Sequence, residues 1–243
     1  MKTIFHKLFA PVKNLPAFIH LPIRGVLTGL MTPAIYSLRT GHFRSSLVNK
    51  PVDRKGNPLP WYSYSLIDFL YPKDFTERNI LEFGAGQSTF WWAKRSKKVV
   101  SFEGDLGWYN KLKQCRPANV DLHLVSIASP QQCVEDILTI FEEKKYGAFD
   151  IVALDGLWRF ELCRIAKDIL TPDGIIIADN ANGYGIYEAF KDERDFRRVD
   201  FWGNAPGVML EHCSSVFFRS ESFLFGCNHK LPYSIYGGML CEE

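Results

Sequence analysis

Residues 79–89, with the sequence NILEFGAGQST, decide the fold of this chain. The apolar residues ahead of the first glycine indicate the end of a buried strand, and Ser88 and Thr89 open the helix that follows. Residues 84–86 form the tight turn between the two elements. Glycines let a backbone approach a ligand closely, and the free N–H groups of a helix start face that ligand. The stretch therefore predicts a nucleotide-type cofactor site.

Two residues beside the turn indicate which ligand it holds. Glu82 precedes the turn, where its carboxylate can meet a cationic group of a cofactor. The third glycine of the dinucleotide fingerprint would fall at position 89, where the chain has Thr89. An NAD-linked oxidoreductase is therefore an alternative that this position counts against.

Strands and helices alternate from residue 79 onward. We expect strands at 79–83, 98–103, 120–126, 149–154 and 174–178, and helices at 88–95, 105–114, 130–144, 159–170 and 184–193. This alternation predicts an α/β fold with a doubly wound, mostly parallel sheet covered on both faces by helices. Residues 198–202 and 215–218 indicate two further strands with no helix between them, so we expect an antiparallel pair at one edge.

Acidic residues follow several of these strands directly. Glu103 ends the second strand, where an acidic side chain can accept hydrogen bonds from both hydroxyls of a ribose. Asp155 ends the fourth strand, and Asp179 and Asn180 follow the fifth. Ligands of doubly wound sheets bind at the carboxyl ends of the strands, so we expect these side chains to meet at one edge.

Two histidines lie close to the predicted strands. His123 falls within a strand pattern, where a place in the core or on a sheet face is expected. His212 falls in the predicted loop between the last two strands, where a histidine without a role is commoner than a general base. Neither histidine is assigned a catalytic role.

The order and spacing of these motifs resemble the class I S-adenosylmethionine-dependent methyltransferases. The resemblance covers residues 61–220 and rests on LEFGAG (81–86), FE (102–103), FDIVALDG (149–156) and LTPDGIIIADN (170–180). It implies a seven-stranded sheet of order 3-2-1-4-5-7-6 with strand 7 antiparallel. It also implies that S-adenosylmethionine is the cofactor, with its methionine part near the turn and its ribose on Glu103. The implied cofactor-binding residues are Glu82, Gly84, Ala85, Gly86, Ser88, Thr89, Glu103 and Asp155.

The resemblance implies an enzyme that transfers a methyl group to a small-molecule or glycan acceptor, at oxygen. Trp61 and Tyr64 belong to an aromatic segment ahead of the first core strand. We interpret them either as lid or substrate contacts or as a packing flap over the sheet. The segment resembles one in bacterial family members found near polysaccharide-biosynthesis genes. A non-catalytic, membrane-associated binding protein on the same fold is a further alternative.

Asp155, Asp179 and Asn180 are the predicted catalytic residues. They match in type and order the metal ligands of the catechol-type, cation-dependent O-methyltransferases, and oxygen ligands suit Mg²⁺. Those enzymes carry a lysine base three residues after the first aspartate, where this chain has Trp158, followed by Arg159. An arginine cannot act as a base at neutral pH. We therefore favour a site in which the three residues face the cofactor or the acceptor without metal, with Mg²⁺ as the alternative.

The chain divides at residue 60 into an N-terminal helical extension with a linker (1–60) and a methyltransferase domain (61–243). Residues 1–52 contain seven Lys or Arg and no Asp or Glu, whereas the remainder has a net charge of −5. Apolar spacing predicts two short helices, at 22–30 and 33–40, with Thr32 and Pro33 starting the second. The uncharged run between the arginines has 14 residues, fewer than the ~20 of a transmembrane helix.

Two roles for this extension are open. Residues 1–40 could contact the anionic inner face of a membrane peripherally. They could instead cap the core or form a homodimer contact, which we favour. Nucleic acid is not expected as a partner, because the aromatic residues do not interleave with the charges. Six scattered cysteines without a Cys-x-x-Cys pair predict reduced thiols and a cytoplasmic protein.

Overall fold

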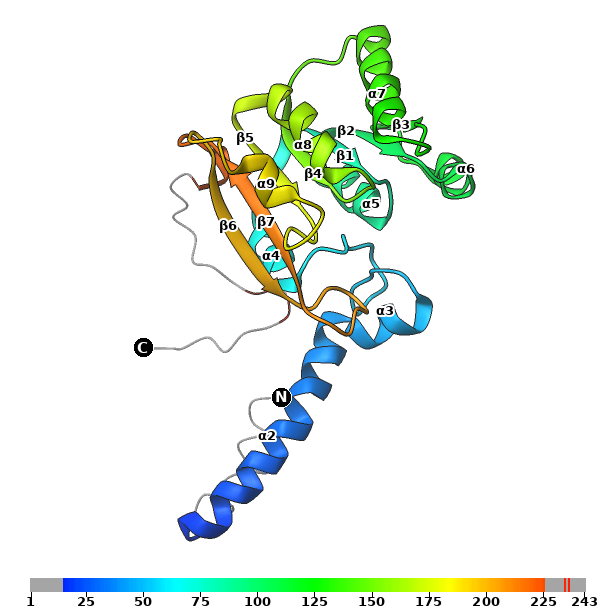
Figure 1. The fold of residues 1–243 in the computed structure, drawn as a ribbon. Coiled ribbons are helices and arrows are strands. Elements are labelled where there is room, and N and C mark those ends of the chain that lie inside the picture. The colour runs from blue at the N-terminus through cyan, green and yellow to red at the C-terminus, as the bar shows by residue number, and fades with distance from the viewer. Residues whose placement is uncertain (1–14, 226–233, 235, 237–243) are drawn as a thin grey trace.

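A computed structural model describes residues 15–225, 234 and 236. It contains a seven-stranded sheet of order β3-β2-β1-β4-β5-β7-β6, which confirms the predicted order (Figure 1). The strands β1 to β5 pair in parallel, and β7 runs antiparallel to both β5 and β6. The strands span β1 Phe75–Phe83, β2 Ser96–Glu103, β3 Val120–Leu124, β4 Phe149–Leu154, β5 Leu170–Ala178, β6 Arg197–Gly203 and β7 His212–Phe218.

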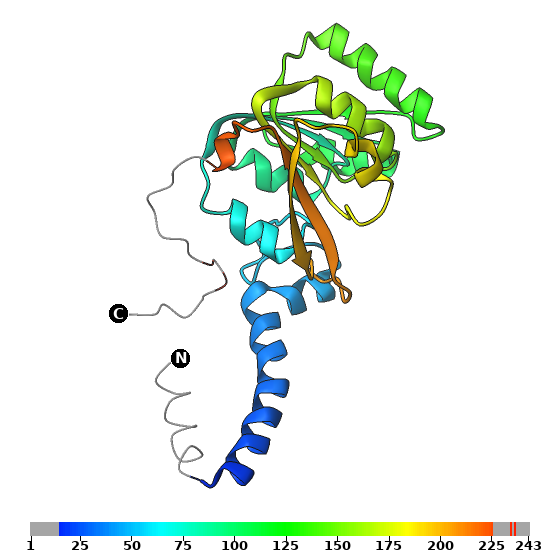
Figure 2. The ribbon, with the colours of Figure 1, turned by 60° about the vertical axis from the view of Figure 1, so that its left-hand side comes forward.

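Helices cover both faces of the sheet, as Figures 1 and 2 show from two sides. Their bounds in the core are α4 Tyr64–Leu70, α5 Gln87–Ala93, α6 Leu106–Cys115, α7 Pro130–Lys144, α8 Arg159–Asp168 and α9 Ile186–Phe190. A short 3-10 helix, η1, spans Phe223–Phe225. The predicted alternation of strands and helices is confirmed, with boundaries displaced by a few residues.

The central strands explain why the sheet is buried on both sides. Successive residues of β1 and β4, such as Ile80 and Leu81 or Ile151 and Val152, have no exposed surface and point to opposite faces. One apolar cluster around Leu81 and Val152 packs beneath α7 and α8. Another, around Ile80 and Ile151, packs beneath α4 and α5. A parallel sheet of this kind fixes its strand ends rigidly, so residues at those ends are placed precisely.

The N-terminal extension differs from the prediction of two short helices. Residues Ala17–Thr40 form one continuous helix, α2, with Pro22 and Pro33 inside it. Thr32 is therefore not a helix cap, because the helix continues through Pro33. A proline inside a helix removes one backbone hydrogen bond and commonly bends the helix. Of its residues only Thr40 is buried, and the helix projects away from the core (Figures 1 and 2).

Helix α2 is longer than the 14-residue uncharged run from which we expected no transmembrane helix. It has 24 residues and an 18-residue window with a mean hydropathy of 1.2, none of which is buried against the protein. By length and composition it is long enough to cross a membrane. The 14-residue count ended at Arg24, but the helix continues through Arg24, whose long side chain can carry its charge away from an apolar surface.

Residues 41–60 pack onto the core. They include an unpredicted helix, α3 (His42–Val48), that follows α2 directly at Gly41. Gly41 has φ +83°, and a β-carbon there would lie 2.4 Å from the backbone carbon of Asp53. The Ser45 hydroxyl donates to the Val52 carbonyl at 2.8 Å, and Leu59 is buried in the core. The segment is thus folded back onto the domain.

The described cysteines are free thiols. Cys133 and Cys163 are buried in helices, and Cys213 is buried in β7. Cys115 is exposed at the end of α6. Cys227 and Cys241 lie outside the described residues.

Candidate functional site

A cavity of about 570 Å³ lies over the carboxyl ends of β1, β2 and β4. This volume is typical of sites for small ligands and cofactors. The predicted site residues that line it are Trp61, Gly84, Ala85, Gly86, Ser88, Glu103 and Asp155. Of the predicted residues, five are not part of its lining: Tyr64, Glu82, Thr89, Asp179 and Asn180.

The glycine turn has one glycine that the fold requires and one that it does not. Gly84 has φ +95°, and a β-carbon there would lie 2.8 Å from the Gly156 nitrogen and 2.9 Å from the Asp155 carbonyl carbon. Gly86 is extended, with φ −170°, and a β-carbon there would meet nothing closer than the Ser88 hydroxyl at 3.7 Å. Gly84 therefore allows β1 to pack against the end of β4, whereas Gly86 leaves open space on the cavity side.

Glu103 is held at the end of β2 by backbone donors. Its Oε2 accepts a hydrogen bond from the Ala85 N–H at 3.1 Å. Its Oε1 accepts from the N–H groups of Gly104 and Asp105 at 2.9 and 2.8 Å. Burial raises the pKa of this carboxyl, and the three N–H donors oppose that rise. The carboxylate is thus fixed at the wall of the cavity and tied to the glycine turn.

Glu82 lies beneath the turn and is not part of the cavity lining, and its predicted contact with a cationic ligand group stays a prediction. It has no exposed surface, and its Oε2 accepts hydrogen bonds from the hydroxyls of Thr89 and Ser101. Thr89 also accepts from the Gly86 N–H at 2.9 Å. Burial raises the pKa of Glu82 to about 7, against the lowering effect of the neighbouring hydroxyls. Glu82 and Thr89 therefore fix the turn from below.

Arg159 is a site residue that the sequence did not assign. It is 6% exposed, and its Nη2 donates to Asp155 Oδ1 at 3.1 Å. Its Nη1 donates to Asn180 Oδ1 at 3.0 Å, and its Nε donates to the Gly156 carbonyl at 2.9 Å. The guanidinium thus joins the ends of β4 and β5. Burial and the nearby Asp179 carboxylate raise the pKa of Asp155 well above its usual value, while Arg159 opposes that rise.

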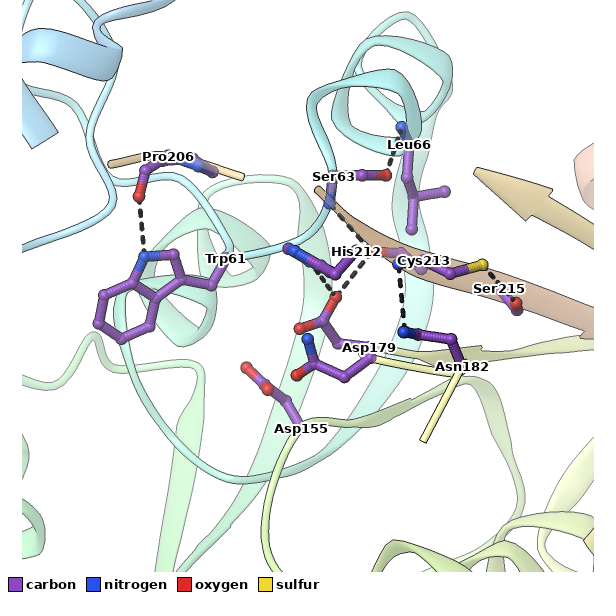
Figure 3. Close-up of polar contacts among 12 residues, drawn as sticks. Trp61, Ser63, Leu66, Asp155, Asp179, Asn182, Pro206, His212, Cys213 and Ser215 are labelled. Atoms are coloured by element: carbon purple, nitrogen blue, oxygen red, sulfur yellow. Dashed lines mark hydrogen bonds and ion pairs between the residues drawn. The ribbon is translucent and has the colours of Figure 1, made fainter. Parts of the chain in front are cut away.

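Asp179 faces β7 instead of the cavity (Figure 3). Its Oδ1 accepts hydrogen bonds from the Ser214 hydroxyl at 2.6 Å and from His212 Nε2 at 3.1 Å. The Ser63 N–H in turn donates to Ser214 Oγ at 2.9 Å. His212 is the first residue of β7, whereas the sequence pattern placed it in a loop. His212 and Ser214 are two residues apart in the strand, so their side chains lie on the same face. This alternation is the feature of the sequence that indicates a place for His212 in the strand.

These contacts do not fit a magnesium ion held by Asp155, Asp179 and Asn180. The Arg159 guanidinium already bonds one carboxylate oxygen of Asp155, Oδ1, and the Asn180 Oδ1. An Asp179 oxygen is occupied by two donors from β7. Of the three residues, only Asp155 lines the cavity. The expected contact of Asp179 and Asn180 with a cofactor or an acceptor therefore stays a prediction.

The two aromatic residues of the predicted lid have different surroundings. Trp61 lines the cavity, is 43% exposed, and donates from Nε1 to the Pro206 carbonyl at 2.9 Å (Figure 3). Tyr64 is buried away from the cavity, with ring centres 5.7 Å from Tyr36 and 5.2 Å from Tyr236. Tyr64 therefore packs against the base of α2 through Tyr36.

The cavity also has walls that the sequence did not indicate. One wall comes from residues 49–51, which follow α3. The opposite end is apolar, with Val125 and Ile127 after β3 and Ile137 of α7. Trp108 of α6 donates from Nε1 to the Ala85 carbonyl at 2.8 Å and so buttresses the turn. The sequence did not indicate these residues, because the direction of each side chain depends on how its helix or loop packs against the rest of the domain.

Comparisons with known proteins agree with this fold. No protein-family model matches the chain, and no curated protein matches its sequence. Among solved structures, it is similar to the O-methyltransferase from Bacillus cereus in complex with SAH, with a TM-score of 0.51 and 15% identity over 82% of this chain and 97% of that one. A putative O-methyltransferase from Klebsiella pneumoniae has a TM-score of 0.49 and 15% identity over 81% and 94%. The chain therefore has the fold of the class I S-adenosylmethionine-dependent methyltransferases.

Proposed function

We propose that this protein is an S-adenosylmethionine-dependent methyltransferase that acts at an oxygen of a small-molecule or glycan acceptor. One observation carries the proposal. The Glu103 carboxylate, fixed by three backbone N–H groups, stands at the cavity wall beside the Gly84–Gly86 turn. A rigid pair of acceptor oxygens next to a close-approach backbone suits a ribose and the chain attached to it.

The residues of the cavity fit this cofactor. Glu103 would hold the ribose hydroxyls, and the apolar end around Val125 and Ile127 would hold the adenine. The Gly84–Gly86 turn and Asp155 would hold the methionine part. When bound, S-adenosylmethionine supplies an activated methyl group on a sulfonium centre.

The protein must then orient the acceptor and remove its proton. Asp155 is the predicted catalytic residue that lines the cavity, and Arg159 fixes its orientation. In methylation of a hydroxyl, a bond would form between the oxygen and the methyl carbon while the bond from that carbon to the sulfonium sulfur breaks, which would leave S-adenosylhomocysteine. Asp155 would accept the hydroxyl proton. A carboxylate whose pKa is raised by burial is a better base near neutral pH than an ordinary one. Alignment of the acceptor supplies the remaining rate enhancement.

The position of Thr89 favours this function over an NAD-linked oxidoreductase. Its side chain is hydrogen-bonded to Glu82 and to the Gly86 N–H, and it is buried under the turn. The dinucleotide fingerprint uses a glycine at this point for close packing of helix and strand. A methyltransferase turn held by Glu82 and Thr89 requires no third glycine.

Calorimetric titration of the full chain with S-adenosylhomocysteine and, separately, with NAD tests the proposal. We expect saturable binding of S-adenosylhomocysteine and none of NAD. Binding of NAD alone would support the oxidoreductase. Binding of neither would support a non-catalytic protein that retains the fold.

A further inference from the structure

Helix α2 presents apolar side chains that the other described residues leave exposed. Phe18 and Leu30 are 79% and 69% exposed, and Leu21, Val26 and Leu38 are also exposed. At 100° per residue these positions fall on several sides of the helix, so no single face is turned toward the core. A helix that is apolar on most sides and lacks a protein covering suits a lipid environment.

The end of the core next to α2 is apolar as well. Helix α3 exposes Phe43 and Leu47, which are four residues apart and share a face. The loop between β6 and β7 exposes Met209, at 87%, and Leu210. The loop touches α3, because the Gly207 N–H donates to His42 Nδ1 at 3.3 Å. We call Phe43, Leu47, Met209 and Leu210 the apolar rim; Figure 1 shows α3 and this loop at the base of α2.

Charge identifies the partner that would cover these surfaces. Residues 1–52 carry seven basic and no acidic side chains, and Arg39 and Arg44 lie at the junction of α2 and α3. Pairing α2 with the same helix of a second copy would bring two such basic segments together, and like charges oppose association. An anionic lipid surface attracts them, at about 1 kcal/mol for each basic residue near the surface.

The dimensions agree with insertion. A helix of 24 residues is about 36 Å long, and the hydrocarbon core of a bilayer is about 30 Å thick. The apolar rim lies at the end of α2 that joins the core, where a bilayer surface would meet it. Residues 49–51, which line the cavity, follow α3 directly.

We infer that α2 inserts into an anionic lipid bilayer and that the apolar rim rests on its surface. The attachment keeps the domain on the membrane and places the wall of the cavity formed by residues 49–51 beside the lipid. This inference does not depend on the reaction that the cavity performs.

Flotation of the full chain with lipid vesicles tests the inference. The vesicles are of phosphatidylcholine alone or of an equimolar mixture with phosphatidylglycerol. Leu30→Asp places a charge on α2, and Leu138→Asp is the matched control, an exposed leucine of α7 on the far side of the core. Circular dichroism checks that both variants melt like the parent chain.

We expect the parent chain and Leu138→Asp to float with the mixed vesicles, at low and at high salt, because apolar insertion is not screened. Leu30→Asp should reduce the floated fraction about tenfold or more, since a charge within the bilayer is costly. Met209→Asp should reduce it less. A parent chain that stays unbound at low salt, or a Leu30→Asp variant that floats like the parent, would overturn the inference. Light scattering that shows a dimer lost in Leu30→Asp, without vesicle capture, would instead assign α2 to contact between copies.

Discussion

The two halves of the strand edge use acidic residues in opposite ways. On the β1–β2 side, Glu103 is held by backbone N–H groups and stands at the cavity wall. On the β5–β7 side, Asp179 is bonded by Ser214 and His212 and turned away from the cavity. Glu103 is the last residue of β2, and Asp179 follows β5 directly. A strand end therefore fixes where a carboxylate is, and its neighbours decide whether a ligand can reach it.

Arg159 marks the boundary between the two halves. Its guanidinium bonds Asp155 on one side and Asn180 on the other. It supplies the positive charge that a metal ion would bring to the same oxygens. We call the β1–β2 side, where Glu103 reaches the cavity, the open half, and the β5–β7 side, where Asp179 is hydrogen-bonded to β7, the closed half. The carboxylates of the open half suit a neutral or cationic ligand. The hydrogen bonds of the closed half hold β5 and β7 together.

The largest effect should separate the two glycines of the turn. Gly84→Ala should reduce the stability of the whole edge, because a left-handed alanine costs about 1–3 kcal/mol and its β-carbon also meets the Asp155–Gly156 backbone. Gly86→Ala should leave the unfolding free energy within ~0.5 kcal/mol of the parent, because its β-carbon has room. Urea unfolding measures both. Equal destabilisation by the two substitutions would show that the turn is not packed as described.

Glu82 should make stability depend on pH. Its pKa is raised from 4.5 to about 7, so between these values the folded protein holds a proton that the unfolded chain has released. Stability therefore falls as pH rises through this window, by about 3 kcal/mol for this group. Glu82→Gln should remove that part of the decline. Unfolding free energies measured at several pH values for both chains give the difference, and parallel curves would contradict it.

Glu103→Ala should weaken binding of S-adenosylhomocysteine by about 10- to 100-fold, corresponding to the loss of charged hydrogen bonds worth about 1–3 kcal/mol. Its matched control is Glu143→Ala, an exposed glutamate of α7. Calorimetry of the two variants at one pH measures the effect. Unchanged affinity in Glu103→Ala would remove this residue from the cofactor site.

Asp179→Asn should lower the stability of the protein and leave its affinity for S-adenosylhomocysteine nearly unchanged. It weakens the hydrogen bonds with Ser214 and His212 and should lower the unfolding free energy by about 1–2 kcal/mol. Affinity for S-adenosylhomocysteine should change less than about twofold, because Asp179 does not line the cavity. A large loss of affinity with unchanged stability would place Asp179 in the open half.

Magnesium should have no effect. Asp155 Oδ1 and Asn180 Oδ1 each accept a hydrogen bond from Arg159. We therefore expect no heat of binding on titration with MgCl₂. We also expect the same affinity for S-adenosylhomocysteine with and without EDTA. Saturable Mg²⁺ binding that Asp155→Asn abolishes would restore the catechol-type alternative.

The sequence was sufficient for the features that depend on backbone pattern. The alternation of strands and helices, the glycine turn and the place of Glu103 follow from apolar runs, glycines and spacing, which act locally. The strand order itself was implied by the resemblance to the class I methyltransferases. The roles of Arg159 and His212 could not be predicted in the same way. Each depends on which way a side chain turns after a strand or helix start, and that direction is set by packing between distant elements. The contribution of residues 49–51 to the cavity is of the same kind.

In the N-terminal extension, the apolar spacing correctly indicated helix. The prediction of a boundary at Pro33 was wrong, because α2 continues through this residue. A proline in the first turn and a proline within a continuous helix leave similar local patterns. The longer helix α2 became evident from the structure, together with the absence of a covering surface over its described residues.

The cavity is proposed to hold S-adenosylmethionine through Glu103 and the glycine turn. A crystal structure of the full chain grown with S-adenosylhomocysteine is the sharpest test. We expect both ribose hydroxyls within hydrogen-bonding distance of the Glu103 carboxylate, the adenine between Val125 and Ile127, and the sulfur near Asp155. A ligand bound elsewhere, or one in this cavity whose ribose does not contact Glu103, would contradict it.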